Sequence, residues 1–304
     1  MNADLENPYN DIRGGKAGFY EQKRGLIAVW GKEATQFLDG MITNDMKTLE
    51  DGAQMLAAFP NTQGRLLAVV RLLRQGDRFL IETEESTREK VYQNLFRFTF
   101  AGDFFVDDLS DNFSYFEIFG PRQDVYNPKV GERFPGSYAF ELSHGAAYFV
   151  PVELAGKFRD FLVVENGCIA ISDDLYETLR IESGIPKYGV DMDETTIVPE
   201  LGLDGLISYN KGCYIGQEII ARIHFRGHVA KRFTGLVSVA DGLNPGTELT
   251  ADSKNAGRIT SVIFSPKLDK TIALAFVRYD YLAEGTELIA DGQPVTVSNL
   301  PFIK

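Results

Sequence analysis

The chain has 304 residues, of which 44% are hydrophobic and 24% charged, a composition typical of a globular protein with substantial cores. At roughly 100–150 residues per domain, this length predicts two or three domains. The 43 acidic and 31 basic side chains give a formal charge of −12, which argues against a nucleic-acid-binding protein, because phosphate binding requires clustered Lys and Arg.

The cysteines and the hydropathy pattern limit where the protein is expected to act. Two cysteines, Cys168 and Cys213, are too few for a disulfide framework in a chain of this length. Residues 1–15 are polar, without the apolar core of a signal peptide, and no run approaches the roughly 20 apolar residues of a membrane helix. We therefore expect a cytoplasmic protein without a membrane partner.

The first 110 residues mix helical and strand patterns. Apolar residues recur at helical spacing in two segments, and strand-like apolar runs broken by turn residues lie between them. These patterns predict a helix, three strands and a second helix, at 32–46, 53–83 and 86–100. Gly64, in the turn between the first two strands, is suited to a positive φ.

The middle of the chain is predicted to be rich in strands and to end in a helix. Apolar runs at 113–120 and 159–171 predict strands. Residues 173–184 then predict a helix, with Asp174 as its N-cap and Gly184 as the residue that ends it.

The last 70 residues change character. Short apolar runs are separated by Gly, Pro, Asn and Asp at fairly even spacing, which is typical of a small antiparallel barrel or sandwich. The predicted strands are 233–239, 247–251, 257–264, 271–277, 286–290 and 294–298. We therefore expect two regions, 1–232 and 233–304.

Glu182 is the first candidate binding residue. It lies on the same helical face as Leu175 and Leu179, which should point toward the core. A buried carboxylate needs strong hydrogen-bond donors, and it can accept two parallel N–H bonds from a heterocycle such as a pterin. The alternative is that the helix end has turned toward solvent.

Cys213 is the second candidate. It lies in a glycine-bracketed turn just before a predicted helix, two residues from Lys211, and such surroundings favour a reactive thiolate. The alternative is a small packed residue, which is the environment expected for Cys168 in its apolar run. His224 and His228 resemble a zinc pair, but no third ligand stands nearby and we expect no metal site.

Five segments of the chain resemble one known family, the YgfZ-type folate-binding proteins, which are relatives of the glycine-cleavage T-protein and act in assembly or repair of iron–sulfur clusters. The most specific is "KGCYIGQE" at 211–218, which resembles the signature of the family. The other segments that resemble family blocks are 37–49, 59–65, 179–203 and 257–266.

The resemblance implies an α+β fold, in which two interleaved α+β modules and a C-terminal antiparallel barrel form a ring around a folate cavity. It implies tetrahydrofolate or a derivative as cofactor, bound by Glu182, Tyr188, Gln217 and Arg222. It also implies catalytic roles for Lys211 and Cys213, and iron–sulfur client or assembly proteins as partners.

One departure separates this chain from aminomethyltransferases of the superfamily. T-proteins have a pair of aspartates shortly after the hairpin that 59–65 resembles, whereas this chain has Ala68 and Val69 there. Neither side chain can protonate or stabilise an amine. We therefore expect a retained cavity without aminomethyl-transfer chemistry.

Three functions follow as hypotheses. The first is a tetrahydrofolate-binding accessory protein for iron–sulfur cluster assembly or repair, with Cys213 beside the cavity. The second is a folate-dependent aminomethyltransferase or related one-carbon group-transfer enzyme that uses another acid. The third is a non-catalytic interaction protein with a vestigial cavity.

Overall fold

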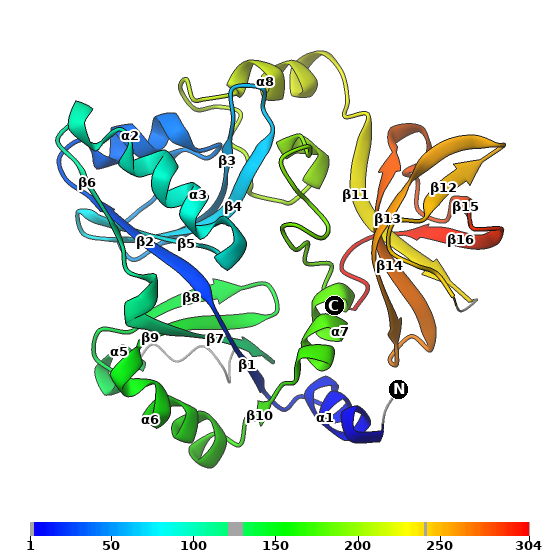
Figure 1. Ribbon diagram of the computed structural model, residues 1–304, viewed down its shortest axis with the longest axis horizontal. Helices are drawn as coiled ribbons and strands as arrows, with labels where there is room; N and C mark the ends of the chain where they lie inside the picture. The colour runs from blue at the N-terminus through cyan, green and yellow to red at the C-terminus, as the bar shows by residue number, and fades with distance from the viewer. Residues whose placement is uncertain (1–2, 121–129, 240–241, 304) are drawn as a thin grey trace.

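The computed structural model describes residues 3–120, 130–239 and 242–303, whose strands form two five-stranded sheets and a closed barrel (Figure 1). The strand order is β10-β1-β7-β9-β8 in the first sheet and β3-β4-β5-β2-β6 in the second. The chain starts the first sheet, builds the entire second sheet, and then returns to complete the first. The predicted α+β fold of two interleaved modules and a C-terminal barrel is confirmed.

The strands are bounded as follows. The first sheet contains β1 (Gly18–Gln22), β7 (Phe113–Phe119), β8 (Tyr138–Leu142), β9 (Gly145–Pro151) and β10 (Ile169–Ala170). The second contains β2 (Arg24–Trp30), β3 (Gln54–Pro60), β4 (Leu66–Gln75), β5 (Arg78–Glu84) and β6 (Phe105–Asp108). The barrel contains β11 (Lys231–Ser238), β12 (Glu248–Ala251), β13 (Lys254–Ser265), β14 (Lys270–Arg278), β15 (Glu287–Ala290) and β16 (Gln293–Ser298).

The helices of the described residues lie mainly on the outer faces of the sheets and between the modules. They are α1 (Ala3–Arg13), α2 (Ala34–Met41), α3 (Glu85–Phe96), α5 (Val130–Arg133), α6 (Ala155–Asp160), α7 (Asp173–Glu182) and α8 (Gln217–Arg226).

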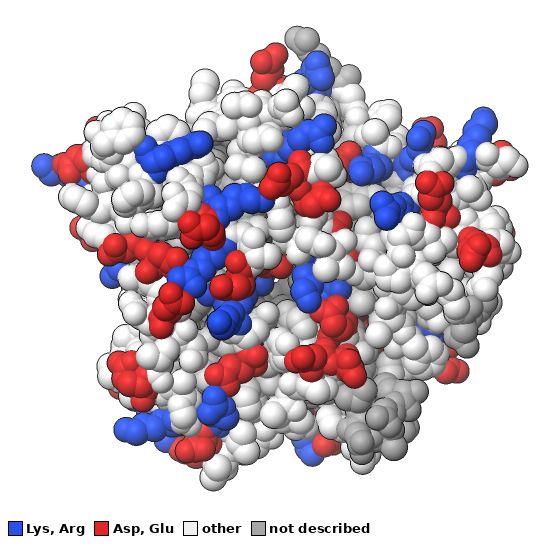
Figure 2. All heavy atoms as spheres, viewed as in Figure 1, with Lys and Arg blue, Asp and Glu red and all other residues white. Residues whose placement is uncertain are grey.

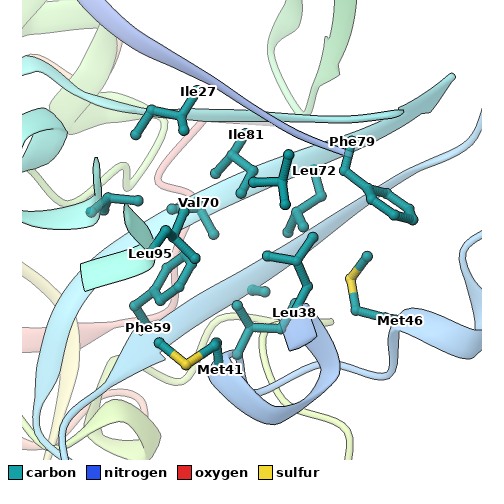
Figure 3. Close-up of a cluster of buried hydrophobic side chains, with 14 of the residues drawn as sticks. Ile27, Leu38, Met41, Met46, Phe59, Val70, Leu72, Phe79, Ile81 and Leu95 are labelled. Atoms are coloured by element: carbon teal, nitrogen blue, oxygen red, sulfur yellow. The ribbon is translucent and has the colours of Figure 1, made fainter. Parts of the chain in front are cut away.

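Both faces of the second sheet are covered, which explains the apolar runs of its strands. On the outer face, Leu38 of α2 and Leu95 of α3 point toward strand residues such as Val70 (Figure 3). On the inner face, Leu80 packs against Phe149 of the first sheet. The result is a layered body of helices, second sheet, first sheet and α6.

The barrel begins with β11 at Lys231. Each of its six strands overlaps a strand that the sequence predicts. Its interior is filled by alternate residues of the strands, among them Leu236, Leu249 and Leu288. Its outer surface beside α7 and α8 contributes Phe233 and Ile272 to a separate core with the loops of the first region. That second core fixes the barrel against the rest of the molecule.

The structure corrects the prediction of a strand across 159–165. α6 continues directly into a π-helical turn, Phe161–Glu165. Phe158 and Leu162, four residues apart, are buried against the first sheet, whereas Val164 is 78% exposed. A short apolar run does not distinguish a strand from a helix, and here the helical spacing of the buried pair decides the outcome.

The cap of α7 is also corrected. The hydroxyl of Ser172, not the side chain of Asp174, accepts the hydrogen bond from the Leu175 N–H. Gly184 has φ +68° and follows the last turn of the helix, as predicted. Cys168 is buried, also as predicted.

No helix among residues 3–120, 130–239 and 242–303 is long and apolar enough to cross a membrane.

Candidate functional site

A cavity of about 650 Å³ lies where the two sheets, the segment after α7 and the barrel meet. Strands of the second sheet supply Arg24, Arg71 and Glu82 to its wall, and the start of the barrel supplies Arg232 and Phe233. Figure 2 shows a hollow near the middle of the molecule, bordered by basic and acidic side chains. A concave space of this size with a few converging polar groups is suited to a small ligand.

Glu82 is at the centre of the charge cluster on the sheet side of the cavity. Arg71 faces Glu82 across the β4–β5 pair, and Arg24, the partner of Glu84 across the β2–β5 pair, reaches the other oxygen of Glu82. Arg24 Nε donates to Oε1 at 2.7 Å, and Arg71 Nη1 lies 3.3 Å from Oε2. Burial alone lowers the pKa of Arg24, but the charge of Glu82 raises it above its usual range. Arg24 is therefore a permanent cation that is already paired.

Arg180 also lines the cavity, and its guanidinium is hydrogen-bonded to other groups of the protein. Its Nη1 donates to Asp191 Oδ2 at 2.8 Å and to the Ile185 carbonyl at 2.6 Å. Its Nε and Nη2 both donate to Glu177. These bonds hold the segment that follows α7 against the cavity.

Glu84 is a second acid in the cavity wall, two residues beyond Glu82 on the same face of β5. Its two oxygens share the backbone N–H of Tyr188, each at 3.1 Å. Burial raises the pKa of Glu84, and the charge of Arg24 opposes that rise only in part. Within the described residues, Glu84 has no ion-pair partner within 4 Å.

Glu182 is fully buried, as its helical spacing predicts, but its carboxylate does not line the cavity. Oε1 accepts from the Tyr9 hydroxyl at 2.7 Å and from the hydroxyl of Ser265 in β13. Oε2 forms an ion pair with Arg13 of α1. The pterin-binding role implied for Glu182 stays a prediction, and the contacts in the structure join α1, α7 and the barrel.

Tyr188 contacts Lys90 of α3. The Lys90 ammonium donates to the Tyr188 hydroxyl at 3.0 Å and lies 5.0 Å from the ring centroid. Lys90 also forms an ion pair with Glu194. Tyr188 is half-buried and next to the cavity wall in sequence, although its own side chain is not among the lining residues.

Lys211 is buried below the thiol loop, which we define as residues 209–216. Its ammonium donates to the carbonyls of Asp39, Ile42 and Asn44 at 2.6, 2.9 and 2.6 Å. An ammonium has three protons, so these three bonds use all its donors. Burial lowers the pKa of Lys211, and the nearby Asp39 carboxylate partly offsets that effect. These hydrogen bonds hold the thiol loop against the end of α2 and the turn that follows it.

Gln217 and Gly216 shape the start of α8. The Gln217 side chain accepts a hydrogen bond from the Tyr214 N–H at 2.8 Å, closing the turn that leads into the helix. Gly216 has φ +79°, and a Cβ on it would lie 2.2 Å from the Asn61 carbonyl oxygen. The thiol loop therefore packs tightly on the hairpin between β3 and β4.

Cys213 is exposed and lies outside the cavity wall, as does the exposed side chain of Arg222 on α8. Lys211 and Cys213 thus lie in the thiol loop and Gln217 at the start of α8 directly after it, apart from Glu182. None of the six predicted site residues is among the described residues that line the cavity.

The sequence reasoning missed the charged wall of the cavity. Glu82 and Glu84 stand two apart at the end of the strand segment "FLIETE", directly after three apolar residues, so both point to one face. Acids on one face of a buried strand are costly unless paired or functional. That pattern was a usable signal for the cavity.

The described residues contain no group of three His, Cys, Asp or Glu placed to hold a metal ion. His224 stacks on Tyr209 with ring centroids 3.6 Å apart, and His228 stacks on Tyr279 at 3.8 Å. Both histidines therefore contact aromatic rings on different surfaces.

Two family models match separate parts of this chain. The GCVT N-terminal domain matches residues 12–126, and the glycine cleavage T-protein C-terminal barrel domain matches residues 231–304. Two separate parts of the chain are thus similar to the N-terminal domain and the C-terminal barrel domain of glycine cleavage T-proteins. The finer resemblance to YgfZ-type proteins stays a prediction.

Two relatives that match most of this chain are named aminomethyltransferases. That of Bdellovibrio bacteriovorus is 27% identical, over 98% of this chain and 91% of its own length. That of Thermoanaerobacter pseudethanolicus is 24% identical, over 92% of this chain and 83% of its own length. The structure of glycine cleavage system aminomethyltransferase T from Bartonella henselae matches with a TM-score of 0.86, at 20% identity, covering 98% of this chain and 89% of that one. The fold is the T-protein fold.

Ala68 and Val69, the positions that depart from the T-protein aspartates, point in opposite directions. Ala68 is buried in the core under α2 and α3, whereas Val69 lines the cavity. The pairing of Val70 with Thr83, continued by one residue, sets Val69 opposite Glu84. The cavity wall is thus apolar at position 69 and acidic on the neighbouring strand.

Proposed function

We propose that this chain binds tetrahydrofolate in the central cavity and takes part in a folate-dependent one-carbon or aminomethyl group transfer. The observation that supports this function is the cavity of about 650 Å³, enclosed by the T-protein fold and lined by paired arginines and the additional acid Glu84. Relatives of similar length named aminomethyltransferases support the same class of reaction.

Within that proposal, the residues of this chain supply binding and orientation. The Arg24–Glu82–Arg71 cluster carries one excess positive charge, which Glu84 on the same wall balances. Lys187 and Arg232, at the rim, can attract the negatively charged glutamate tail of a folate. A bound tetrahydrofolate would supply the nitrogen atoms that accept the one-carbon unit.

Calorimetric titration of the wild-type chain with tetrahydrofolate tests the binding. We expect saturable binding with one site per chain. The transfer is tested by release of ammonia or formaldehyde from aminomethyl and methylamine donors, with and without tetrahydrofolate. No saturable binding would contradict the proposed function. Binding without any turnover would restrict it to a folate-binding role.

A second candidate is an accessory role in assembly or repair of iron–sulfur proteins, and the exposure of Cys213 favours it. The thiol loop holds Cys213 outside the cavity, where it can reach another protein. Iron–sulfur centres usually have four protein ligands, so this thiol alone would hold a cluster only in transit or jointly with a partner. A Cys213→Ala strain should lose activity of cluster-dependent enzymes, and full retention of that activity would exclude this role.

A further inference from the structure

Glu117 is a buried acid of the first sheet that lies next to the cavity wall. It is on β7 and shares a face of the sheet with Gln22 of β1, because Gln22 pairs with Tyr115, two residues from Glu117. Its carboxylate is 5% exposed and accepts three side-chain hydrogen bonds, two of them from residues that line the cavity. Glu117 thus connects the interior of the first sheet with the cavity.

The hydrogen bonds to Glu117 fix the orientation of the Gln22 amide. Glu117 Oε1 accepts from His144 Nε2 at 2.8 Å, and Oε2 accepts from Gln22 Nε2 at 2.7 Å. Burial alone raises the pKa of Glu117, but the hydrogen bond from His144 and the nearby positive charges lower it below its usual value. An ionised carboxylate only accepts hydrogen bonds, so it faces the NH₂ group of the amide and not the carbonyl.

The second amide proton of Gln22 is also used. Gln22 Nε2 donates to the Tyr176 hydroxyl at 3.2 Å, and that hydroxyl donates to Glu117 Oε2 at 3.3 Å. The carbonyl oxygen is therefore the only group that the amide can still offer, and within the described residues no donor reaches it. Gln22 also borders a smaller hollow beside Arg88, but Tyr176 lines the large cavity and not that hollow.

Gln54, the other glutamine of the described cavity wall, is arranged differently. Its Nε2 donates to the Glu141 carbonyl, and its Oε1 accepts from the Glu141 N–H, each at 2.9 Å. Both ends of this amide already have partners in the backbone of β8. Gln22 is thus the glutamine whose acceptor is left for a ligand.

A single acceptor that is held in one orientation matches an isolated donor on a ligand. The aminopyrimidinone edge of a folate carries two adjacent N–H donors, whereas the reduced ring of tetrahydrofolate carries single N–H groups at N5 and N8. In the fully oxidised ring these two nitrogens have lone pairs and no proton. A carbonyl oxygen that faces one of them is left unpaired, and an unpaired polar group costs binding free energy.

We propose that the carbonyl oxygen of Gln22 accepts a hydrogen bond from a ring N–H of the reduced pterin, and so selects tetrahydrofolate over oxidised folate. Glu117 is the positioning residue that holds the amide in this orientation. The inference rests on the proposed binding of tetrahydrofolate in the cavity and adds selectivity for the oxidation state of the ring.

Calorimetric titration of the wild type, Gln22→Met and Gln54→Met with tetrahydrofolate and with folic acid tests the selectivity. Methionine is similar in length to glutamine but is only a weak acceptor. We expect the wild type to prefer tetrahydrofolate at least about tenfold, and Gln22→Met to reduce that preference by about threefold to tenfold. Gln54→Met is the matched control and should retain the preference within about twofold, because its amide contacts the β8 backbone.

The ratio of the two affinities separates selection from general damage to the cavity, which would weaken the binding of both ligands. An unchanged ratio in Gln22→Met would overturn the inference, as would a wild type that binds both ligands equally. Absence of saturable tetrahydrofolate binding to the wild type would contradict the proposed function and, with it, this inference.

Analogues of tetrahydrofolate with carbon in place of N5 or of N8 separate the hydrogen bond from the shape of the ring. Each analogue keeps the reduced ring but lacks one N–H group. We expect one of them to bind the wild type about threefold to tenfold more weakly than tetrahydrofolate, and this penalty to disappear in Gln22→Met. If the wild type binds tetrahydrofolate and both analogues equally, the proposed hydrogen bond does not exist.

Glu117→Gln tests the positioning role. A neutral amide at position 117 can donate to the Gln22 carbonyl as well as accept from its NH₂ group, so Gln22 is no longer held in one orientation. We expect the preference for tetrahydrofolate to fall by at least about threefold, with both ligands still bound. A folded Glu117→Gln with the full wild-type preference would exclude the positioning role.

Gln22→Asn covers the case in which Gln22→Met does not fold. It keeps an amide but withdraws it by one methylene group, so we expect a reduced preference for tetrahydrofolate. Wild-type selectivity in a folded Gln22→Asn would also overturn the inference.

Discussion

Cys213 and Cys168 are both free thiols, but their surroundings are opposite. Cys213 is exposed on the thiol loop, whereas Cys168 is buried in the core under α6, where burial raises the pKa of its thiol. The thiolate is the reactive form, so burial slows the reaction of Cys168 both by excluding the reagent and by raising the pKa of its thiol. We expect iodoacetamide to label Cys213 at least about tenfold faster than Cys168 at neutral pH.

Mass spectrometry of the modified peptides measures the two labelling rates, and Cys213→Ala provides the control for the slow site. Equal rates in the folded protein would contradict the difference in environment. Fast labelling of Cys168 alone would show that the core under α6 opens more readily than the contacts indicate.

At the scale of single residues, the sequence predicts burial better than it predicts partners. The helical spacing of Leu175, Leu179 and Glu182 correctly predicts a buried carboxylate. The donors that satisfy Glu182 come from α1 and β13, which are 169 and 83 residues away in the chain, so no local pattern could name them. Lys211 is similar, because its three acceptors lie at the end of α2 and in the turn after it, far away in the chain.

At the scale of elements, the contact between the thiol loop and the β3–β4 hairpin depends on two glycines. Gly216 has φ +79°, with the Asn61 carbonyl oxygen 2.2 Å from the position of a Cβ. Gly64 has φ +69° and faces Ile219 and Ile220 of α8. The hairpin and α8 can approach this closely only because neither of these two positions carries a side chain.

We therefore expect Gly216→Ala to destabilise the fold by about 2 kcal/mol or more, since a non-glycine residue at this φ costs about 1–3 kcal/mol before the clash is counted. Gly212→Ala is the matched control in the same loop, because a Cβ there meets no atom within 4 Å. Urea unfolding of the two variants measures the difference. Equal stability would contradict tight packing of the loop on the hairpin.

The same scale shows why some elements could be predicted and others could not. All six barrel strands agree with the sequence prediction, because each is short, apolar and bounded by turn residues. The segment 159–165 fails because its four consecutive apolar residues fit either period. Its helical form is set by the pocket into which Phe158 and Leu162 fit on the first sheet, which is information from tertiary structure.

At the scale of the whole molecule, Glu182 joins parts that are distant in the chain. Its carboxylate contacts α1 and the barrel, and its backbone carbonyl accepts from the N–H groups of Phe302 and Ile303. Figure 1 shows α1, α7 and the C-terminal segment together beside the barrel. The two ends of the described chain therefore meet at one residue.

We expect Glu182→Gln to lower the free energy of unfolding by about 1–3 kcal/mol, because buried hydrogen bonds to a charged group are replaced by weaker ones. Exposed Glu287→Gln is the control and should change stability by less than about 0.5 kcal/mol. Urea unfolding and limited proteolysis near α1 measure the effect. Stability equal to that of the wild type would contradict a stabilising role for the contacts of Glu182 with α1 and the barrel. A stable variant with lost folate affinity would return Glu182 to ligand binding.

The separation in sequence of the groups around Glu182 has a consequence for how the chain becomes stable. Tyr9 contacts Glu182 across 173 residues and the Lys267 N–H across 258. Closing such long loops carries an entropy cost that local contacts do not, so these bonds form only when most of the chain is already in place. During synthesis, α1 therefore remains without these contacts until the barrel has been synthesised. The contacts of the Glu182 carboxylate are therefore complete only in a chain that includes the barrel. A chain truncated before the barrel would leave this carboxylate without its Ser265 contact.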